Sequence, residues 1–128
     1  MVYMYSAIFT TEDSQVFAKI PDLQGCVTSG HSLDEAIDLI TDAASVWLVS
    51  AEEDGDVIPA ASAQSDLGIP EGAVVSLIRV DTIAYRAATD TKAVRKNVSL
   101  PAWMANLADK RGINCSQVLQ DGLLAKLS

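Results

Sequence analysis

The most informative segment of the chain spans residues 94–124 and reads VRKNVSLPAWMANLADKRGINCSQVLQDGLL. At its start, apolar residues (Val94, Val98, Leu100) alternate with polar ones (Arg95, Asn97, Ser99). A period of two predicts a strand with one apolar face and one hydrogen-bonding face.

Two helices are predicted after this strand. Pro101 suits the first turn of the first helix, whose apolar stripe and expected core contacts are Trp103, Met104, Leu107 and Ala108. Gly112 favours a left-handed end to that helix. Asn114 is a typical first cap of the second helix, and Gln117 stands three positions later as in a capping box.

A segment of this length needs a partner to fold. Residues 92–128 number 37, and below about 40 residues a chain rarely folds without disulfides, a metal or oligomerisation. The segment has a single cysteine and no metal-ligand pattern, so we expect two copies to pair their strands and share one core. The paired ribbon then presents Arg95, Asn97 and Ser99 twice, in a shape that fits the major groove of DNA.

Charge divides the chain into two unlike parts. Residues 1–90 contain 15 acidic and 3 basic residues, a net charge of −12, whereas residues 91–128 carry a net charge of +4. Such asymmetry indicates two kinds of partner, one of them nucleic acid. Residues 87–91 are small and polar without periodicity, which predicts a linker between the two parts.

The acidic part is predicted to be a small α+β domain. Its expected strands span residues 2–10, 15–20, 26–29 and 73–83. A long helix is expected after the third strand, because Ser32 and Glu35 form a capping-box pattern and apolar residues then recur at helical spacing, Trp47 among them. The predicted element order is therefore strand, strand, strand, helix, strand.

Composition excludes several classes of protein. The chain has 128 residues, 49% of them hydrophobic, which excludes disorder as its main state. No apolar run approaches the ~18 residues of a membrane span, and the N-terminus has no basic stretch typical of a signal peptide. The two cysteines, Cys26 and Cys115, suggest no disulfide framework, so we expect a cytoplasmic protein that is not tied to a membrane.

Two segments carry a resemblance to known families. The tail resembles a ribbon-helix-helix DNA-binding domain, in its alternating strand, its Pro101 and its segment Gly112-Ile113-Asn114-Cys115-Ser116. In the front part, Ile20-Pro21-Asp22-Leu23-Gln24-Gly25-Cys26-Val27-Thr28-Ser29-Gly30 and Ser32-Leu33-Asp34-Glu35-Ala36 resemble the HicB antitoxin family. The combination covers nearly the whole chain.

The resemblance implies a fold and a function. The fold would be α+β, with a βββαβ domain at residues 1–86 (a reduced ribonuclease H-like sheet on one long helix), a linker at 87–91 and a ribbon-helix-helix domain at 92–128. The protein would be a non-enzymatic antitoxin that neutralises a HicA-like mRNA-cleaving toxin and represses its own operon as a dimer. By position, Arg95, Asn97 and Ser99 would read bases, while Asn114, Cys115 and Ser116 would hold phosphates. Lys96 departs from the family, which often has an apolar residue at this inward position.

Other candidate site residues have simpler explanations. The acidic side chains Asp34, Asp38 and Asp42 lie on one helix face and are either a solvated surface or a toxin-binding site. Turn chemistry accounts for Asp13 and Asp22 better than a metal site does, and His31 is expected in an exposed turn. Cys115 is interpreted as structural. The sequence thus predicts no catalytic residue, metal or cofactor.

Two alternatives stay open beside the antitoxin. One is a stand-alone ribbon-helix-helix regulator without a toxin, and the other is a metal-dependent nuclease or a ligand-sensing domain with a DNA-binding tail. The sequence also leaves open whether dimers associate further through the front domain.

Overall fold

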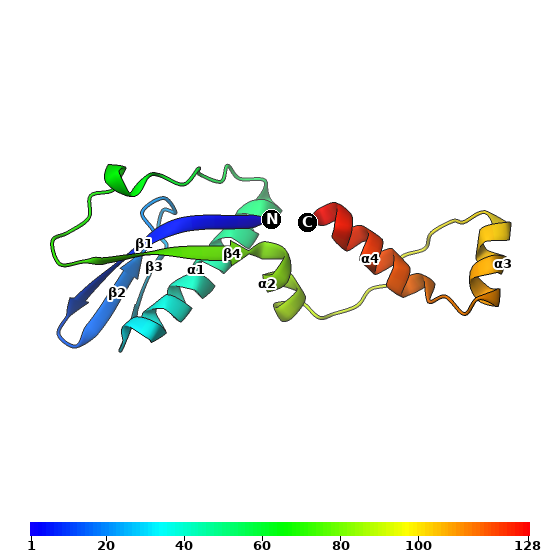
Figure 1. Ribbon diagram of the computed structural model, residues 1–128, viewed down its shortest axis with the longest axis horizontal. Coiled ribbons are helices and arrows are strands. Elements are labelled where there is room, and N and C mark those ends of the chain that lie inside the picture. Colours follow the sequence, from blue (N-terminus) through cyan, green and yellow to red (C-terminus); the bar gives the residue numbers. More distant parts are fainter.

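The computed structural model describes residues 1–128 and arranges them in two parts, a front domain and a tail (Figure 1). The front domain contains one sheet and two helices, and the tail contains two further helices. In chain order the elements are β1 (Val2–Glu12), β2 (Gln15–Lys19), β3 (Val27–Gly30), α1 (Leu33–Asp54), a 3₁₀ turn (Gln64–Asp66), β4 (Val74–Asp81), α2 (Thr82–Thr89), α3 (Ala102–Lys110) and α4 (Cys115–Leu127).

The four strands form one antiparallel sheet in the order β3-β2-β1-β4. Strands β1 and β2 are joined by a two-residue hairpin, in which Glu12 pairs with Gln15. Both turn residues, Asp13 and Ser14, have positive φ angles of 47° and 66°, as a hairpin of this length requires. The predicted order βββαβ is confirmed, with strand ends shifted by a few residues.

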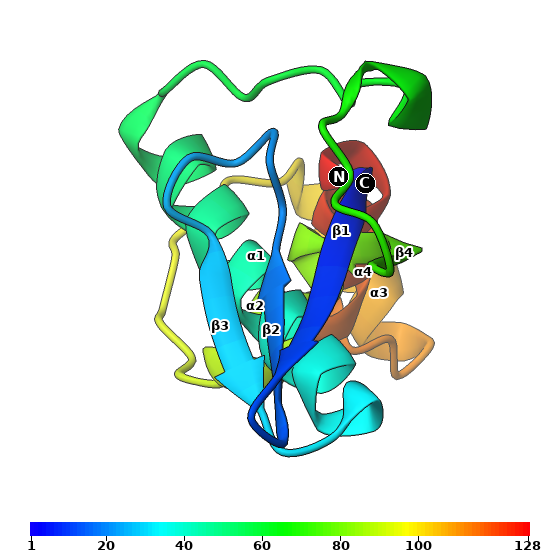
Figure 2. The ribbon, with the colours of Figure 1, turned by 90° about the vertical axis from the view of Figure 1, so that its left-hand side faces the viewer.

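Helix α1 covers one face of the sheet and builds the core of the front domain (Figure 2). Its residues Ala36, Ile40, Ala44 and Leu48 are fully buried against the sheet. Burial of a Leu or Ile side chain contributes roughly 1.5–3 kcal/mol, so this interface supplies much of the driving force for folding. The sheet contributes Tyr5, Ala7, Phe9, Val16, Ala18, Ile78 and Val80 to the same core.

The start of α1 follows the sequence prediction. The Ser32 side chain accepts a hydrogen bond from the backbone N–H of Glu35 at 3.1 Å. Just before it, Gly30 ends β3 where the chain approaches the helix closely. A Cβ atom at Gly30 would lie 3.0 Å from the backbone nitrogen of Ala36, so only glycine fits there without a shift.

Helix α2 occupies part of the predicted linker, and the last strand ends earlier than predicted. Strand β4 ends at Asp81 instead of residue 83, and α2 occupies residues 87–89 of the expected linker. The carboxylate of Asp81 caps this helix by accepting hydrogen bonds from the backbone N–H groups of Ile83 and Ala84, both at 3.1 Å. The alanines at 87 and 88 then favour helix, although their lack of apolar periodicity suggested a linker.

A polar cluster centred on Glu52 fastens α2 to α1 and β1. The Glu52 carboxylate accepts hydrogen bonds from Tyr3 at 2.7 Å, Thr82 at 3.1 Å and Arg86 at 2.7 Å. Thr82 also contacts the carbonyl of Met1. Burial favours a higher pKa for Glu52, but the three hydrogen bonds outweigh it and lower the pKa below the ordinary 4.5. Burial and the bond to Glu52 raise the pKa of Tyr3 to about 12.

The tail has helices but no strand in the single chain. Gly112, with a φ of 65°, follows α3, and the Asn114 side chain caps α4 by accepting from the Gln117 N–H at 3.1 Å, so both helix signals are confirmed. The predicted strand over residues 94–100 is not formed, since no second strand lies beside it. No residue from 91 to 128 is buried, and Trp103, expected in a core, is 63% exposed.

Removing the Glu52 carboxylate should destabilise the front domain. For Glu52→Ala we expect the free energy of unfolding to fall by about 2–3 kcal/mol, because Arg86 and Thr82 lose a charged partner. The pKa of Glu52 is lower in the folded state, so its contribution is full above pH 4.5 and is lost as the pH falls below that value. Urea unfolding at several pH values should therefore show the difference between wild type and variant shrinking in acid.

Glu53→Ala is the matched control. The Glu53 side chain is 66% exposed and lies 4.0 Å from Arg86, so its loss should change the unfolding free energy by less than about 0.5 kcal/mol. Equal effects of the two substitutions at neutral pH would contradict this account of the cluster.

Candidate nucleic-acid interface and partner surfaces

An apolar groove runs between the segment before α3 and the two tail helices. Its volume is about 450 Å³ and most of its lining is hydrophobic. Lys96, Val98 and Leu100 line one side, so three of the four even-numbered positions of the predicted strand face the groove, whereas Val94 is 82% exposed and does not line it. The other lining residues are Met104, Ala108, Ile113, Cys115, Ser116, Val118 and Leu119.

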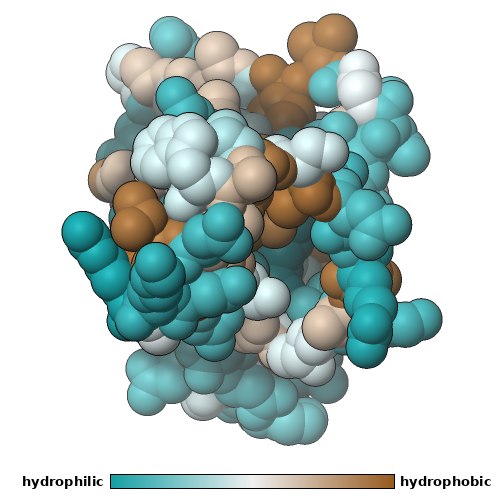
Figure 3. Space-filling view, turned by 90° about the vertical axis from the view of Figure 1, so that its right-hand side faces the viewer, coloured by the Kyte–Doolittle hydropathy of each residue, from teal (hydrophilic) through white to brown (hydrophobic).

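The predicted base-reading residues lie on the other side of this segment. Arg95, Asn97 and Ser99 are exposed and do not line the groove. The alternation expected from the sequence is therefore present over residues 95–100, although the single chain forms no ribbon there. Seen from the tail side, hydrophobic patches interrupt a largely hydrophilic surface (Figure 3).

The predicted phosphate-binding residues gather at the start of α4. Asn114 is the N-cap, and Cys115 and Ser116 form the first turn; all three are exposed. The carboxamide of Gln117 donates to Asp121 at 2.9 Å. The first turn of an α-helix leaves backbone N–H groups without a partner inside the helix. The start of α4 is therefore suited to binding a phosphate.

The acidic residues predicted as a toxin-binding site lie on the outer side of α1. Asp34, Asp38 and Asp42 are all exposed, on the side of the helix away from the sheet. Leu39, 39% exposed, and Val46, 47% exposed, also reach the solvent from this helix. The outer side of α1 therefore combines negative charge with accessible apolar side chains.

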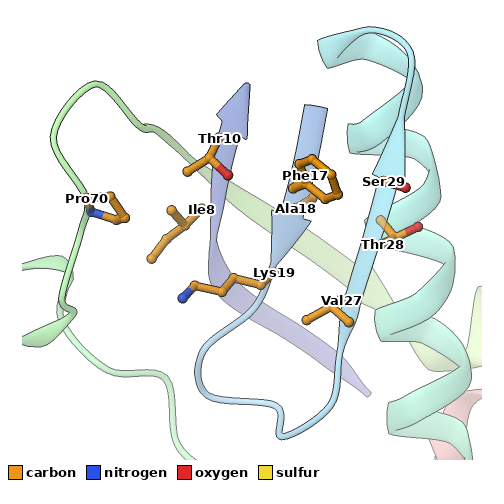
Figure 4. A pocket seen from close by; sticks show the side chains of 9 residues that line it. All are labelled: Ile8, Thr10, Phe17, Ala18, Lys19, Val27, Thr28, Ser29 and Pro70. Atoms are coloured by element: carbon orange, nitrogen blue, oxygen red, sulfur yellow. The ribbon is translucent and has the colours of Figure 1, made fainter. Parts of the chain in front are cut away.

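Sequence reasoning missed the second face of the sheet, which no helix covers. A hollow of about 610 Å³ lies on it, with Ile8, Phe17 and Lys19 on its floor and Val27 and Pro70 at its sides (Figure 4). The strand alternation contained the signal, because Met4, Phe17 and Leu77 are large apolar residues on the face opposite to the core. The sequence did not distinguish these residues from core residues, because β1 is apolar on both faces.

Asp22 has a structural partner. Its carboxylate accepts hydrogen bonds from the backbone N–H of Ser62 at 2.9 Å and from the Ser62 hydroxyl at 2.6 Å. These bonds tie the long connection between α1 and β4 to the turn after β2. Asp13 lies in the β1–β2 turn and His31 is exposed before α1. The structure contains no group of three or more His, Cys, Asp or Glu side chains suited to a metal ion.

The comparisons with known proteins identify the family. The family model described as HicB-like antitoxin of bacterial toxin-antitoxin systems matches residues 5–128. The chain therefore belongs to the HicB-like antitoxins. A search of curated proteins gave no match. No helix in the structure has both the length and the apolar character needed to cross a bilayer.

Solved structures share this fold, two of them over nearly the whole chain. A chain of a toxin-antitoxin complex from Streptococcus pneumoniae is 22% identical with a TM-score of 0.61, covering 98% of this chain and 99% of that one. The antitoxin HicB of Burkholderia pseudomallei is 23% identical with a TM-score of 0.55, over 98% and 99%. Its separately solved N-terminal domain is 27% identical with a TM-score of 0.55, covering 62% of this chain and 99% of that domain.

Asp22→Ala should loosen the connection over residues 56–73. We expect faster hydrogen exchange and proteolysis around Ser62, because the substitution removes both bonds that hold the loop at this point. Ser62→Ala removes only the hydroxyl bond and should give a smaller effect in the same peptides. If wild-type protein cleaves RNA in a metal-dependent manner and Asp22→Ala abolishes cleavage, the nuclease alternative is favoured instead.

Proposed function

We propose that this HicB-like antitoxin neutralises a HicA-like mRNA-cleaving toxin through its front domain and represses its own operon through a dimeric tail. The observation that carries the DNA-binding half is the apolar groove of the tail. The tail buries no residue of its own. We therefore interpret a groove of this size as half of a core that two copies share.

Pairing of two tails would place the base-reading residues correctly. With Lys96, Val98 and Leu100 facing the groove, a second copy of residues 94–100 can pair alongside and close the core. Arg95, Asn97 and Ser99 then project from the opposite face of a two-stranded ribbon. Arginine suits guanine and asparagine suits adenine in the major groove, while the first turn of α4 suits a backbone phosphate.

The toxin half is supported by charge. A ribonuclease must present positive charge to RNA, and an antitoxin domain with a net charge of −12 is attracted to such a surface and able to cover it. The outer side of α1, with Asp34, Asp38 and Asp42, is the part of the front domain that we assign to this contact. The same negative charge keeps the front domain away from DNA while the basic tail docks. A protein with these two partners works in the cytoplasm.

Operator binding should depend on the polar face of the tail segment. For Arg95→Ala with Asn97→Ala we expect at least a tenfold loss of affinity for a DNA fragment with the upstream inverted repeat, since each base contact contributes about 1–3 kcal/mol. Fluorescence anisotropy at fixed salt measures it. Lys126→Ala, a charge change at the far end of α4, serves as the control and should have a small effect. Unchanged binding by the double variant would contradict the proposed reading surface.

Toxin neutralisation should depend on the position of the acidic residues as well as on their number. We expect the triple variant Asp34→Asn, Asp38→Asn and Asp42→Asn to associate more slowly with the toxin and to protect RNA less well from it. A control with Glu53→Gln, Asp54→Asn and Asp56→Asn removes the same charge elsewhere. Equal inhibition by the two variants in an RNA cleavage assay would reject α1 as the contact.

A further inference from the structure

Lys96 is the only charged residue that lines the apolar groove of the tail. Among the other lining residues, Ser116 alone is polar. No carboxylate lines the groove, and Lys96 takes part in neither of the two salt bridges of the chain. An ammonium group that loses its water in this groove would therefore find no opposite charge among the groove residues to replace it.

Pairing of the tails changes the surroundings of Lys96. In the single chain its side chain is exposed, so the ammonium group is hydrated. A second copy of residues 94–100 that closes the groove covers the side on which Lys96 lies and removes part of this water. The inference below rests on the proposed function, because it concerns the dimeric tail.

Two-fold symmetry also brings the two copies of Lys96 close together. When residues 94–100 of two chains pair antiparallel over their full length, the two-fold axis passes beside Asn97, and Lys96 stands opposite Val98 of the second copy. The two Lys96 residues are then diagonal neighbours on the same inward face, about 7–8 Å apart. Their like charges repel, and they repel more strongly where water is partly excluded.

We propose that Lys96 weakens pairing of the tails in the absence of DNA and that operator DNA offsets this effect, so that Lys96 couples pairing to DNA binding. Cys115 and Ser116 line the same groove, and they belong to the helix turn that we assign to a phosphate. A DNA phosphate at this turn brings negative charge towards the two ammonium groups. Negative charge there lowers the free energy cost of keeping both of them charged in the closed groove.

This coupling has a definite thermodynamic form. If DNA lowers the cost of Lys96 in the paired state, an apolar residue at position 96 must stabilise the paired tails more without DNA than with it. The factor by which DNA strengthens pairing is therefore smaller for the apolar variant than for the wild type.

Hydrogen exchange of residues 94–100 in the full-length protein reports pairing of the tails alone. In the single chain none of their backbone N–H groups donates a hydrogen bond, whereas in a ribbon alternate ones bond to the second strand. Without DNA, we expect Lys96→Met to raise the protection of these groups about threefold or more over wild type at equal concentration. Adding a DNA fragment with the upstream inverted repeat should raise protection by a larger factor in the wild type than in the variant.

Two control variants separate the effect of this charge from other effects. Lys96→Arg keeps a positive charge in the groove and should leave the protection close to that of the wild type. Lys92→Met removes a positive charge from the same segment but outside the groove, so it should not change the protection measured without DNA.

The outcomes distinguish this inference from the proposed function. If DNA protects residues 94–100 but Lys96→Met leaves their protection without DNA unchanged or lowers it, the inference is overturned and the dimeric tail stands. An equal strengthening by DNA in wild type and variant would overturn it as well. If these residues stay unprotected in both proteins even on the operator fragment, no ribbon forms, and the proposed DNA-binding mode and this inference fail together.

Discussion

Packing of one helix against one sheet is the interaction on which this structure depends. A four-stranded sheet has two faces, and the front domain has a single long helix, α1, to cover one of them. The fully buried side chains of α1 (Ala36, Ile40, Ala44 and Leu48) form the inner layer of a two-layer core. The other face contacts a loop and solvent. Its apolar residues are exposed because the domain has no helix to cover that face.

The tail likewise has too few elements to cover its apolar side chains. Its two helices and its extended segment surround a groove without burying any residue. In a chain of this size, apolar side chains that find no partner within the molecule are best explained by partners outside it. The front domain and the tail thus share a physical property, incomplete burial, although they carry opposite charge.

The sequence predicted the features that local patterns encode. The order βββαβ, the Ser32 cap and the Asn114 cap follow from alternation, helical spacing and capping residues, and the structure confirms all three. The even-numbered positions of residues 96–100 also face the groove as alternation suggests. Local patterns were sufficient here because each depends on residues fewer than about ten positions apart.

Features that depend on distant residues were not predictable in this way. Glu52 and Arg86 are 34 positions apart, so their ion pair, and with it the anchoring of α2, left no local pattern. The bonds of Asp22 to Ser62 span 40 positions. Trp103 has the spacing of a core residue, yet it is 63% exposed in the single chain, and only in the proposed dimer would a second copy supply a core for it. Which face of the sheet is covered likewise depends on the whole fold.

Helix α2, which ends at Thr89, is anchored to the rest of the front domain. This limits the distance between the front domain and the tail. In the proposed dimer, residues 94–100 are held in the ribbon, which leaves only residues 90–93 as a flexible tether. Four extended residues span at most about 14 Å. Each front domain, together with any protein bound to it, would therefore remain beside the DNA, and the space available around the operator would be set by this short tether.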